Sequence, residues 1–226
     1  MTPLSPYDSE IESLWRAIDA VGAHSVAVVS SLQGEGTTLI ACALARRAGL
    51  TGTPSLLVDL SQSHSWMSDL LDLAPQPGEI VTLRDYDLAV LANVAPEDAS
   101  AWREPSALAA QATRWAADWG LVVFDTTPLL ARNEESIPAK AIASAAQATI
   151  LVVLAGRTPV PVIREARARL DGAGARLIGT VMNDRDNPSL LAELERESYR
   201  LERFLPRPMA ALRSRLRRAA LFSVRT

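Results

Sequence analysis

A short apolar run, SVAVVS from Ser25 to Ser30, leads directly into a turn with two glycines and then into a helical segment, 38–47. The run is rich in β-branched residues and carries no charge, which is typical of a strand buried on both faces of a sheet. Gly49 follows the helical segment, at the place where a helix commonly ends. A buried strand, a glycine turn and a helix in this order predict the first unit of a parallel sheet.

The same alternation of strand and helix continues to about residue 182. Apolar runs predict further strands at 55–59, 87–94, 121–125, 149–155 and 176–182. Helical patterns are found at 8–20, 104–118, 136–147 and 160–173, and most of the irregular structure is expected at 61–86 and 95–103. We therefore expect an α/β fold, a doubly wound and mostly parallel sheet with helices on both faces.

Length and composition favour one domain with an appendage. The chain has 226 residues, of which 48% are hydrophobic, and this is enough for a sizeable core. No apolar run reaches the roughly 18–20 residues that a membrane-spanning helix needs. The start of the chain, MTPLSPYDSE, lacks the basic residues and apolar stretch of a secretory signal. A single cysteine excludes an internal disulfide, so the cytoplasm is the expected location.

The turn after the first strand, SLQGEGTT from Ser31 to Thr38, has the composition of a phosphate-binding loop. Close approach of backbone N–H groups to a phosphate needs glycines, supplied here at 34 and 36, and the N-terminus of a helix behind them. Residues Gly34, Glu35, Gly36, Thr37 and Thr38 are the predicted nucleotide-binding residues, with Thr38 placed to ligate Mg²⁺. The usual pattern, G-x-x-x-x-G-K-[ST], fails at Ser31 and at Thr37, which stands at the lysine position. An inherited turn that binds nothing is the alternative.

Two acids and one amide follow predicted strands. Asp59 and Asp125 each end a strand, where groups gather at the carboxyl edge of a parallel sheet, and their carboxylates suit a metal ion held by phosphates. We predict both as catalytic residues, with Asp125 also a Mg²⁺ ligand. Asn183 follows the last strand and offers a donor and an acceptor to a purine. All three residues are equally well read as turn or cap residues.

These elements resemble, in order, the catalytic domain of the CpsD/CapB-type bacterial tyrosine kinases of polysaccharide export. The resemblance rests on VAVVSSLQGEGTTLIACALARRAG, LLVD, VVFDTTPLL, ILVVLAGRT and ARLIGTVMND. These kinases belong with the ParA/MinD class of P-loop ATPases, a SIMIBI-like group. The resemblance implies ATP or ADP with Mg²⁺ as cofactors, Thr38 and Asp125 as metal ligands, Asp59 in an additional Walker-type motif, and Asn183 at the adenine.

Several positions depart from the pattern of that family. The loop lysine is replaced by Thr37, and the second acid of the D-x-D motif is replaced by Ser61. The N-terminal E-x₂-R-x₂-R motif, which in the family supports ring assembly, survives only as Glu10, Ser13 and Arg16. The C-terminal tyrosine cluster is absent, since the chain has only Tyr7, Tyr86 and Tyr199. Lys140 is the only lysine available to replace the missing charge.

The last forty residues differ from the rest of the chain. We assign 1–186 to the P-loop domain, including the N-terminal helix, and 187–226 to a helical extension. Residues 207–226 carry six arginines and no acid, and a predicted helix, 209–222, has one apolar stripe. Such a helix favours an anionic membrane surface or a membrane-bound partner, and a solvated face of the same domain is the alternative. Nucleic acid is not an expected partner, because the pI is about 5.5.

Three functions remain open from the sequence. The first is a degenerate kinase-like protein that regulates or assembles an exopolysaccharide (capsule or holdfast-like) export machine. It would act at the inner face of the cell membrane, docked on the cytoplasmic tail of a Wzz-like polysaccharide co-polymerase, and could form homo-oligomers. The second is an active ATP-dependent tyrosine autokinase of the same pathway. The third is a ParA/MinD-like positioning ATPase that holds the membrane through 209–222.

Overall fold

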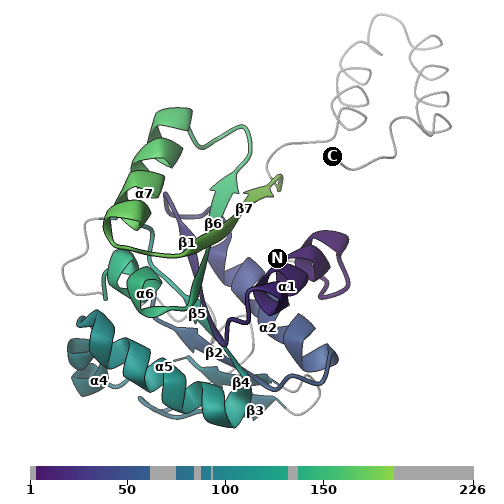
Figure 1. The fold of residues 1–226 in the computed structure, drawn as a ribbon, viewed down its shortest axis with the longest axis vertical. Helices are drawn as coiled ribbons and strands as arrows, with labels where there is room; N and C mark the ends of the chain where they lie inside the picture. The colour runs from purple at the N-terminus through teal and green to yellow at the C-terminus, as the bar shows by residue number, and fades with distance from the viewer. Residues whose placement is uncertain (1–3, 62–74, 84–87, 93, 132–136, 186–226) are drawn as a thin grey trace, which may run out of the picture. The chain divides into compact units, whose positions relative to one another are not determined.

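The computed structural model describes residues 4–61, 75–83, 88–92, 94–131 and 137–185. Within these ranges a seven-stranded sheet has the order β3-β4-β2-β5-β1-β6-β7 (Figure 1). Its strands are β1 (Ser25–Ser30), β2 (Ser55–Asp59), β3 (Val81–Leu83), β4 (Leu88–Leu91), β5 (Leu121–Asp125), β6 (Ala148–Leu154) and β7 (Leu177–Asn183). All neighbouring strands are parallel except β3 and β4, which confirms the predicted mostly parallel sheet.

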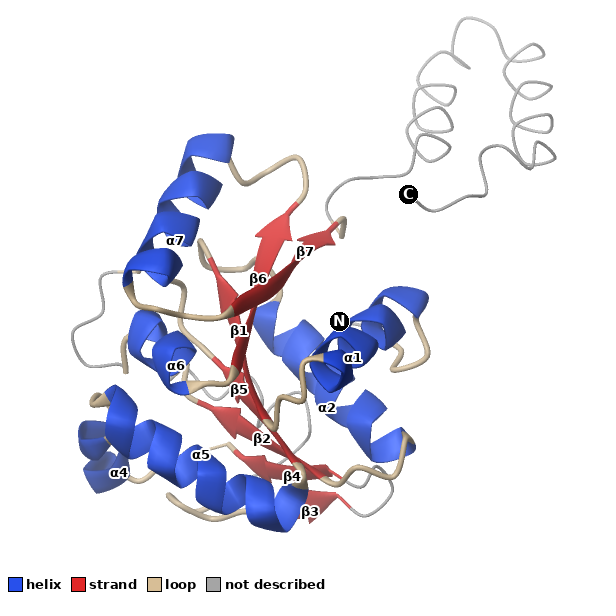
Figure 2. Cartoon of the chain, in the orientation of Figure 1, coloured by secondary structure: helices blue, strands red, loops and turns tan. Residues whose placement is uncertain are grey.

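Helices cover both faces of this sheet (Figure 2). They are α1 (Ser9–Ala20), α2 (Thr37–Leu50), α4 (Pro96–Ala101), α5 (Pro105–Trp119), α6 (Ala139–Ala145) and α7 (Val160–Gly172). One face carries α1 and α2, whose buried residues join one apolar cluster, and the other face carries α5, α6 and α7, whose buried residues join a second. The doubly wound α/β fold is therefore confirmed.

The central strands are buried on both sides because successive side chains point to opposite faces. In β1, Val26 and Val28 belong to the cluster under α1 and α2, whereas Ala27 and Val29 belong to the cluster under α5, α6 and α7. This double burial explains why these strands appear in the sequence as continuous apolar runs and not as an alternation of apolar and polar residues.

Two elements lie where irregular structure was expected. The edge strand β3 is only three residues long and half-buried, so it gives almost no periodic signal. Helix α4 begins with Pro96 in its first turn and has Glu97 and Asp98 beside it, which are residues typical of a helix start. Helix α6 is shorter than the predicted 136–147, because Pro138 occupies its N-cap.

The predicted extension, 187–226, and its helix, 209–222, lie outside the described residues, as does Tyr199. A compact unit comprises the chain up to Leu154 together with Thr158–Asn183. None of the helices in the described ranges combines the length and apolar character required to cross a bilayer.

Candidate functional site

The loop between β1 and α2 places two glycines in left-handed backbone conformations. Gly34 has φ 82° and Gly36 has φ 98°, a region that residues with a Cβ rarely adopt. Gly36 is the N-cap of α2, and as a glycine it has no side chain with which to cap the helix. The first N–H groups of α2, from Thr37 and Thr38, therefore lie at the positive end of a 14-residue helix whose N-cap residue offers them no side-chain acceptor.

Glu35 lies inside the loop and not on its surface, with only 2% of its area exposed. Its Oε2 accepts hydrogen bonds from the backbone N–H of Ser31 at 2.7 Å and of Leu32 at 3.0 Å. Its Oε1 accepts a hydrogen bond from the hydroxyl of Thr158, which follows β6. The Glu35 carboxylate thus binds the first amides of the loop, and any phosphate would meet the later amides of the loop.

Asn183, at the end of β7, contacts the same loop. Its Nδ2 donates a hydrogen bond to the backbone carbonyl of Glu35 at 2.8 Å. A Cβ added at Gly36 would lie 2.4 Å from this Nδ2 atom. The amide therefore holds the loop closely from the side, and its predicted contact with adenine stays a prediction.

Gly36 and Asn183 together make one substitution informative. We expect Gly36→Ala to destabilise the fold by roughly 1–3 kcal/mol through its positive φ, and by about 1 kcal/mol more because the Asn183 amide must move away from the added Cβ and lose its hydrogen bond to Glu35. Urea denaturation measures this difference. Gly34→Ala is the matched control, because Gly34 also has a positive φ but has no atom within 4 Å of an added Cβ. Equal losses in the two variants would show that Asn183 does not hold the loop.

The two predicted acids lie side by side at the carboxyl edge of the sheet. Asp59 of β2 is paired in register with Asp125 of β5, and both are buried. The Thr38 hydroxyl donates to Asp125 Oδ2 at 2.5 Å, so Asp125 faces the end of the loop. Asp59 Oδ1 accepts from the backbone N–H of Ser61 at 2.9 Å and from its hydroxyl at 2.6 Å. Asp125 Oδ1 is buried and has no hydrogen-bond partner among the described residues.

Burial makes the charged form of these carboxyl groups unfavourable. The pKa of Asp125 is raised to about 8, first by burial and then by the negative charge of Asp59. The hydrogen bond from the Thr38 hydroxyl lowers this pKa. Burial likewise raises the pKa of Asp59, while hydrogen bonds from Ser61 lower it. A pair of buried acids that oppose each other's ionisation is a site where a cation would be stabilised.

The arrangement fits Mg²⁺. The unpaired Asp125 Oδ1 and the Thr38 hydroxyl beside Asp125 Oδ2 are hard oxygen ligands, and Asp59 adds a neighbouring charge. A bound Mg²⁺ would supply positive charge to nucleotide phosphates. Mg²⁺ commonly keeps several waters and takes one or two carboxylates from the protein, so a larger cluster is not required.

The sequence did not indicate that Thr158 contacts the loop. Its hydroxyl donates a hydrogen bond to Glu35 and accepts one from the backbone N–H of Leu154 at 3.2 Å. These two bonds join the end of β6 to the loop. The signal that could have found it is its position just after a buried strand, at the same edge as Asp59 and Asp125. Lys140, the candidate replacement for the lost lysine, is exposed on α6, and it lines a cavity that includes no residue of the loop.

Comparison of the sequence finds no matching family model and no matching curated protein. Comparison of the structure finds solved chains of the same fold. The chimerical protein CapA2B2 is 20% identical to this chain, with a TM-score of 0.68. The aligned region covers 79% of this chain and 85% of CapA2B2. The kinase domain of Escherichia coli tyrosine kinase ETK is 18% identical with a TM-score of 0.65, over 79% of this chain and 76% of that one.

The chain has the fold of a bacterial tyrosine kinase domain. The septum site-determining protein MinD from Pyrococcus horikoshii, complexed with Mg-ADP, also shares this fold, at 16% identity and a TM-score of 0.58, over 73% of this chain and 72% of that one. The likeness to these kinase domains and to MinD confirms the doubly wound α/β fold predicted from the sequence. At these identities the likeness establishes the fold alone, and the roles of the loop residues remain predictions.

Proposed function

We propose that this protein is a degenerate member of the bacterial tyrosine kinase group that binds a magnesium nucleotide weakly and transfers phosphoryl groups feebly or not at all. One observation carries the proposal. The loop, the uncapped start of α2 and the paired Asp59 and Asp125 form the frame of a nucleotide site, but Thr37 stands at the lysine position.

The missing charge affects transfer more than binding. Backbone N–H groups and the helix N-terminus attract phosphates without any side chain, so they support binding in the ground state. Phosphoryl transfer also needs positive charge on the moving group, and loss of one such group typically costs about 10²–10³ in rate. Thr37 offers a hydroxyl but no charge. Lys140 lines a different cavity, so it does not supply the charge to the loop.

A regulatory or assembly role in exopolysaccharide export follows as the second part of this proposal. A domain that changes shape or partner with nucleotide occupancy needs binding but not turnover. The partner we propose is the cytoplasmic tail of a membrane polysaccharide co-polymerase, which would place the protein in the cytoplasm at the inner face of the membrane. The arginine-rich segment 209–222 suits contact with anionic lipid beside that partner.

Incubation with ATP and Mg²⁺ tests the catalytic part of the proposal. After this incubation, we expect peptide mass spectrometry to find no phosphate on Tyr199. In a separate calorimetric titration, we expect saturable binding of Mg·ADP with a dissociation constant of about 0.1–1 mM. Asp125→Asn is the control, because it removes the carboxylate that faces Thr38. Phosphorylation of Tyr199 that disappears in Asp125→Asn would identify an active autokinase instead. Absence of binding would identify the loop as an inherited turn.

A further inference from the structure

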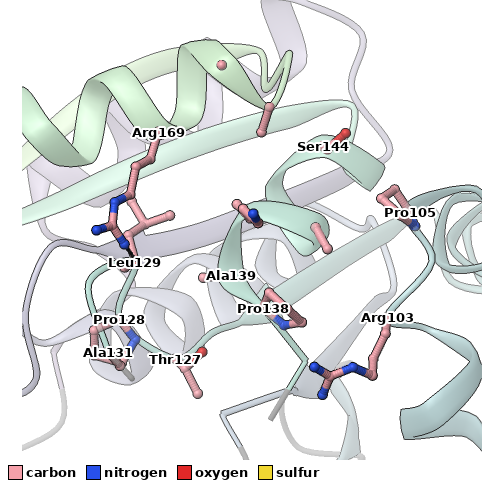
Figure 3. A pocket seen from close by; sticks show the side chains of 14 residues that line it. Arg103, Pro105, Thr127, Pro128, Leu129, Ala131, Pro138, Ala139, Ser144 and Arg169 are labelled. Carbon is pink, nitrogen blue, oxygen red and sulfur yellow. Dashed lines mark hydrogen bonds between the residues drawn. The ribbon is translucent and has the colours of Figure 1, made fainter. Parts of the chain in front are cut away.

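A cavity of about 660 Å³ lies on the face of the sheet covered by α5, α6 and α7 (Figure 3). Its walls come from the start of α5, the segment that follows β5, helix α6 and the end of α7. The volume is within the range of small-molecule sites, roughly 300–1,000 Å³. No residue of the loop 31–38 lines it, and neither Asp59 nor Asp125 does, so it is separate from the nucleotide site.

Every charged side chain among the described lining residues of this cavity is a cation. Arg103, Lys140 and Arg169 all line it, and none of its described lining residues is an acid. The whole chain has a net charge of −3. Figure 3 shows Arg103 and Arg169 on opposite sides of the cavity, with Ala139 between them in this view. Like charges around a concave surface repel one another and attract an anion.

Two of these cations are held differently. The Arg169 guanidinium is fixed in the wall, because it donates to the Leu129 carbonyl at 2.8 Å and to the Glu165 carboxylate at 2.7 Å. Glu165 therefore offsets part of the Arg169 charge from outside the cavity lining. The Lys140 ammonium, by contrast, has no hydrogen bond or ion pair with any residue in the described part of the chain, although it borders a shaped cavity.

We propose that this cavity binds a small phosphate or diphosphate ester, independently of the nucleotide proposed for the loop. Guanidinium groups donate pairs of hydrogen bonds that match phosphate oxygens, and the ammonium adds a point charge. Thr127 and Ser144 line the same cavity, and their hydroxyl groups are further hydrogen-bond donors of the kind that such an ester needs. Pro128 and Pro138 supply rigid apolar surface for its organic part.

Lys140 makes the test selective, because it is the only lysine in the chain. An amine-selective acetylating reagent therefore modifies Lys140 and the N-terminal amine alone, and peptide mass spectrometry separates the two. Inorganic pyrophosphate is the probe, compared with sodium chloride at equal ionic strength. For a dissociation constant of about 1 mM, about 10 mM pyrophosphate slows acetylation of Lys140 roughly tenfold, since the free fraction falls as 1/(1 + [L]/Kd). The N-terminal amine should react at an unchanged rate.

Two variants separate this cavity from the loop. Arg103→Gln removes one exposed cation of the cavity and should reduce the protection of Lys140 at least threefold. Arg114→Gln is the matched control, because Arg114 is an exposed arginine on α5 that does not line the cavity. In this variant, pyrophosphate should protect Lys140 as well as it does in the parent protein. The proposal is overturned if pyrophosphate protects Lys140 no better than chloride does. Equal protection in Arg103→Gln would overturn it as well, because the anion would then bind elsewhere.

Discussion

Glu35→Ala is expected to cost at least about 1–3 kcal/mol of the free energy of unfolding, because it leaves the buried N–H group of Ser31 and the partly buried N–H group of Leu32 without their acceptor. Each unsatisfied buried group costs about 1–3 kcal/mol. The Thr158 hydroxyl also loses its acceptor, so the link between the loop and the end of β6 is broken. A loss of this size is a large part of the total stability of a typical domain, about 5–15 kcal/mol. Urea denaturation followed by circular dichroism measures it.

Glu35→Gln is the matched control for this substitution. Its carbonyl oxygen can accept the hydrogen bonds from Ser31 and Leu32, while its NH₂ group faces the Thr158 oxygen, which can act as acceptor. The expected loss is therefore only about 1 kcal/mol. If Glu35→Ala unfolds at the same urea concentration as the parent protein, the carboxylate does not hold the loop, and the geometry described for this site is wrong.

The sequence predicted the central sheet well, because buried parallel strands are continuous apolar runs. The carboxyl ends of such strands meet at one edge, so the closeness of Asp59 and Asp125 could also be expected, and their pairing in register confirms it. The edge strand β3 was missed because three half-buried residues carry no period. Helix α4 was missed although Pro96, Glu97 and Asp98 mark its start.

The interior of the loop could not be predicted from residue types. Glu35 was placed among the nucleotide-binding residues by its position in the motif, and sequence gives no sign that its carboxylate is buried against Ser31 and Leu32. Its partner Thr158 lies more than a hundred residues away, so only the fold brings the two together. The cavity beside Lys140 was equally invisible, because its walls come from four separate segments of the chain.

Thr37→Lys is expected to produce the largest gain in nucleotide affinity of any single change in the loop. A hydrogen bond to a charged group contributes about 1.5–3 kcal/mol, which corresponds to roughly 10–150-fold in the dissociation constant. The glycine turn at the start of α2 and the hydrogen-bonded oxygens of Thr38 and Asp125, the predicted Mg²⁺ ligands, already lie beside the position of the new ammonium group. Thr37→Gln is the control, since it lengthens the side chain without adding a charge.

Calorimetric titration of the parent protein, Thr37→Lys and Thr37→Gln with Mg·ADP decides whether this loop is a nucleotide site that lacks only its cation. The account predicts that Thr37→Lys binds at least about tenfold more tightly than the parent, while Thr37→Gln binds like the parent. Unchanged or undetectable binding in Thr37→Lys would contradict it, because the amides and the paired acids would then fail to form a phosphate site even with the charge restored.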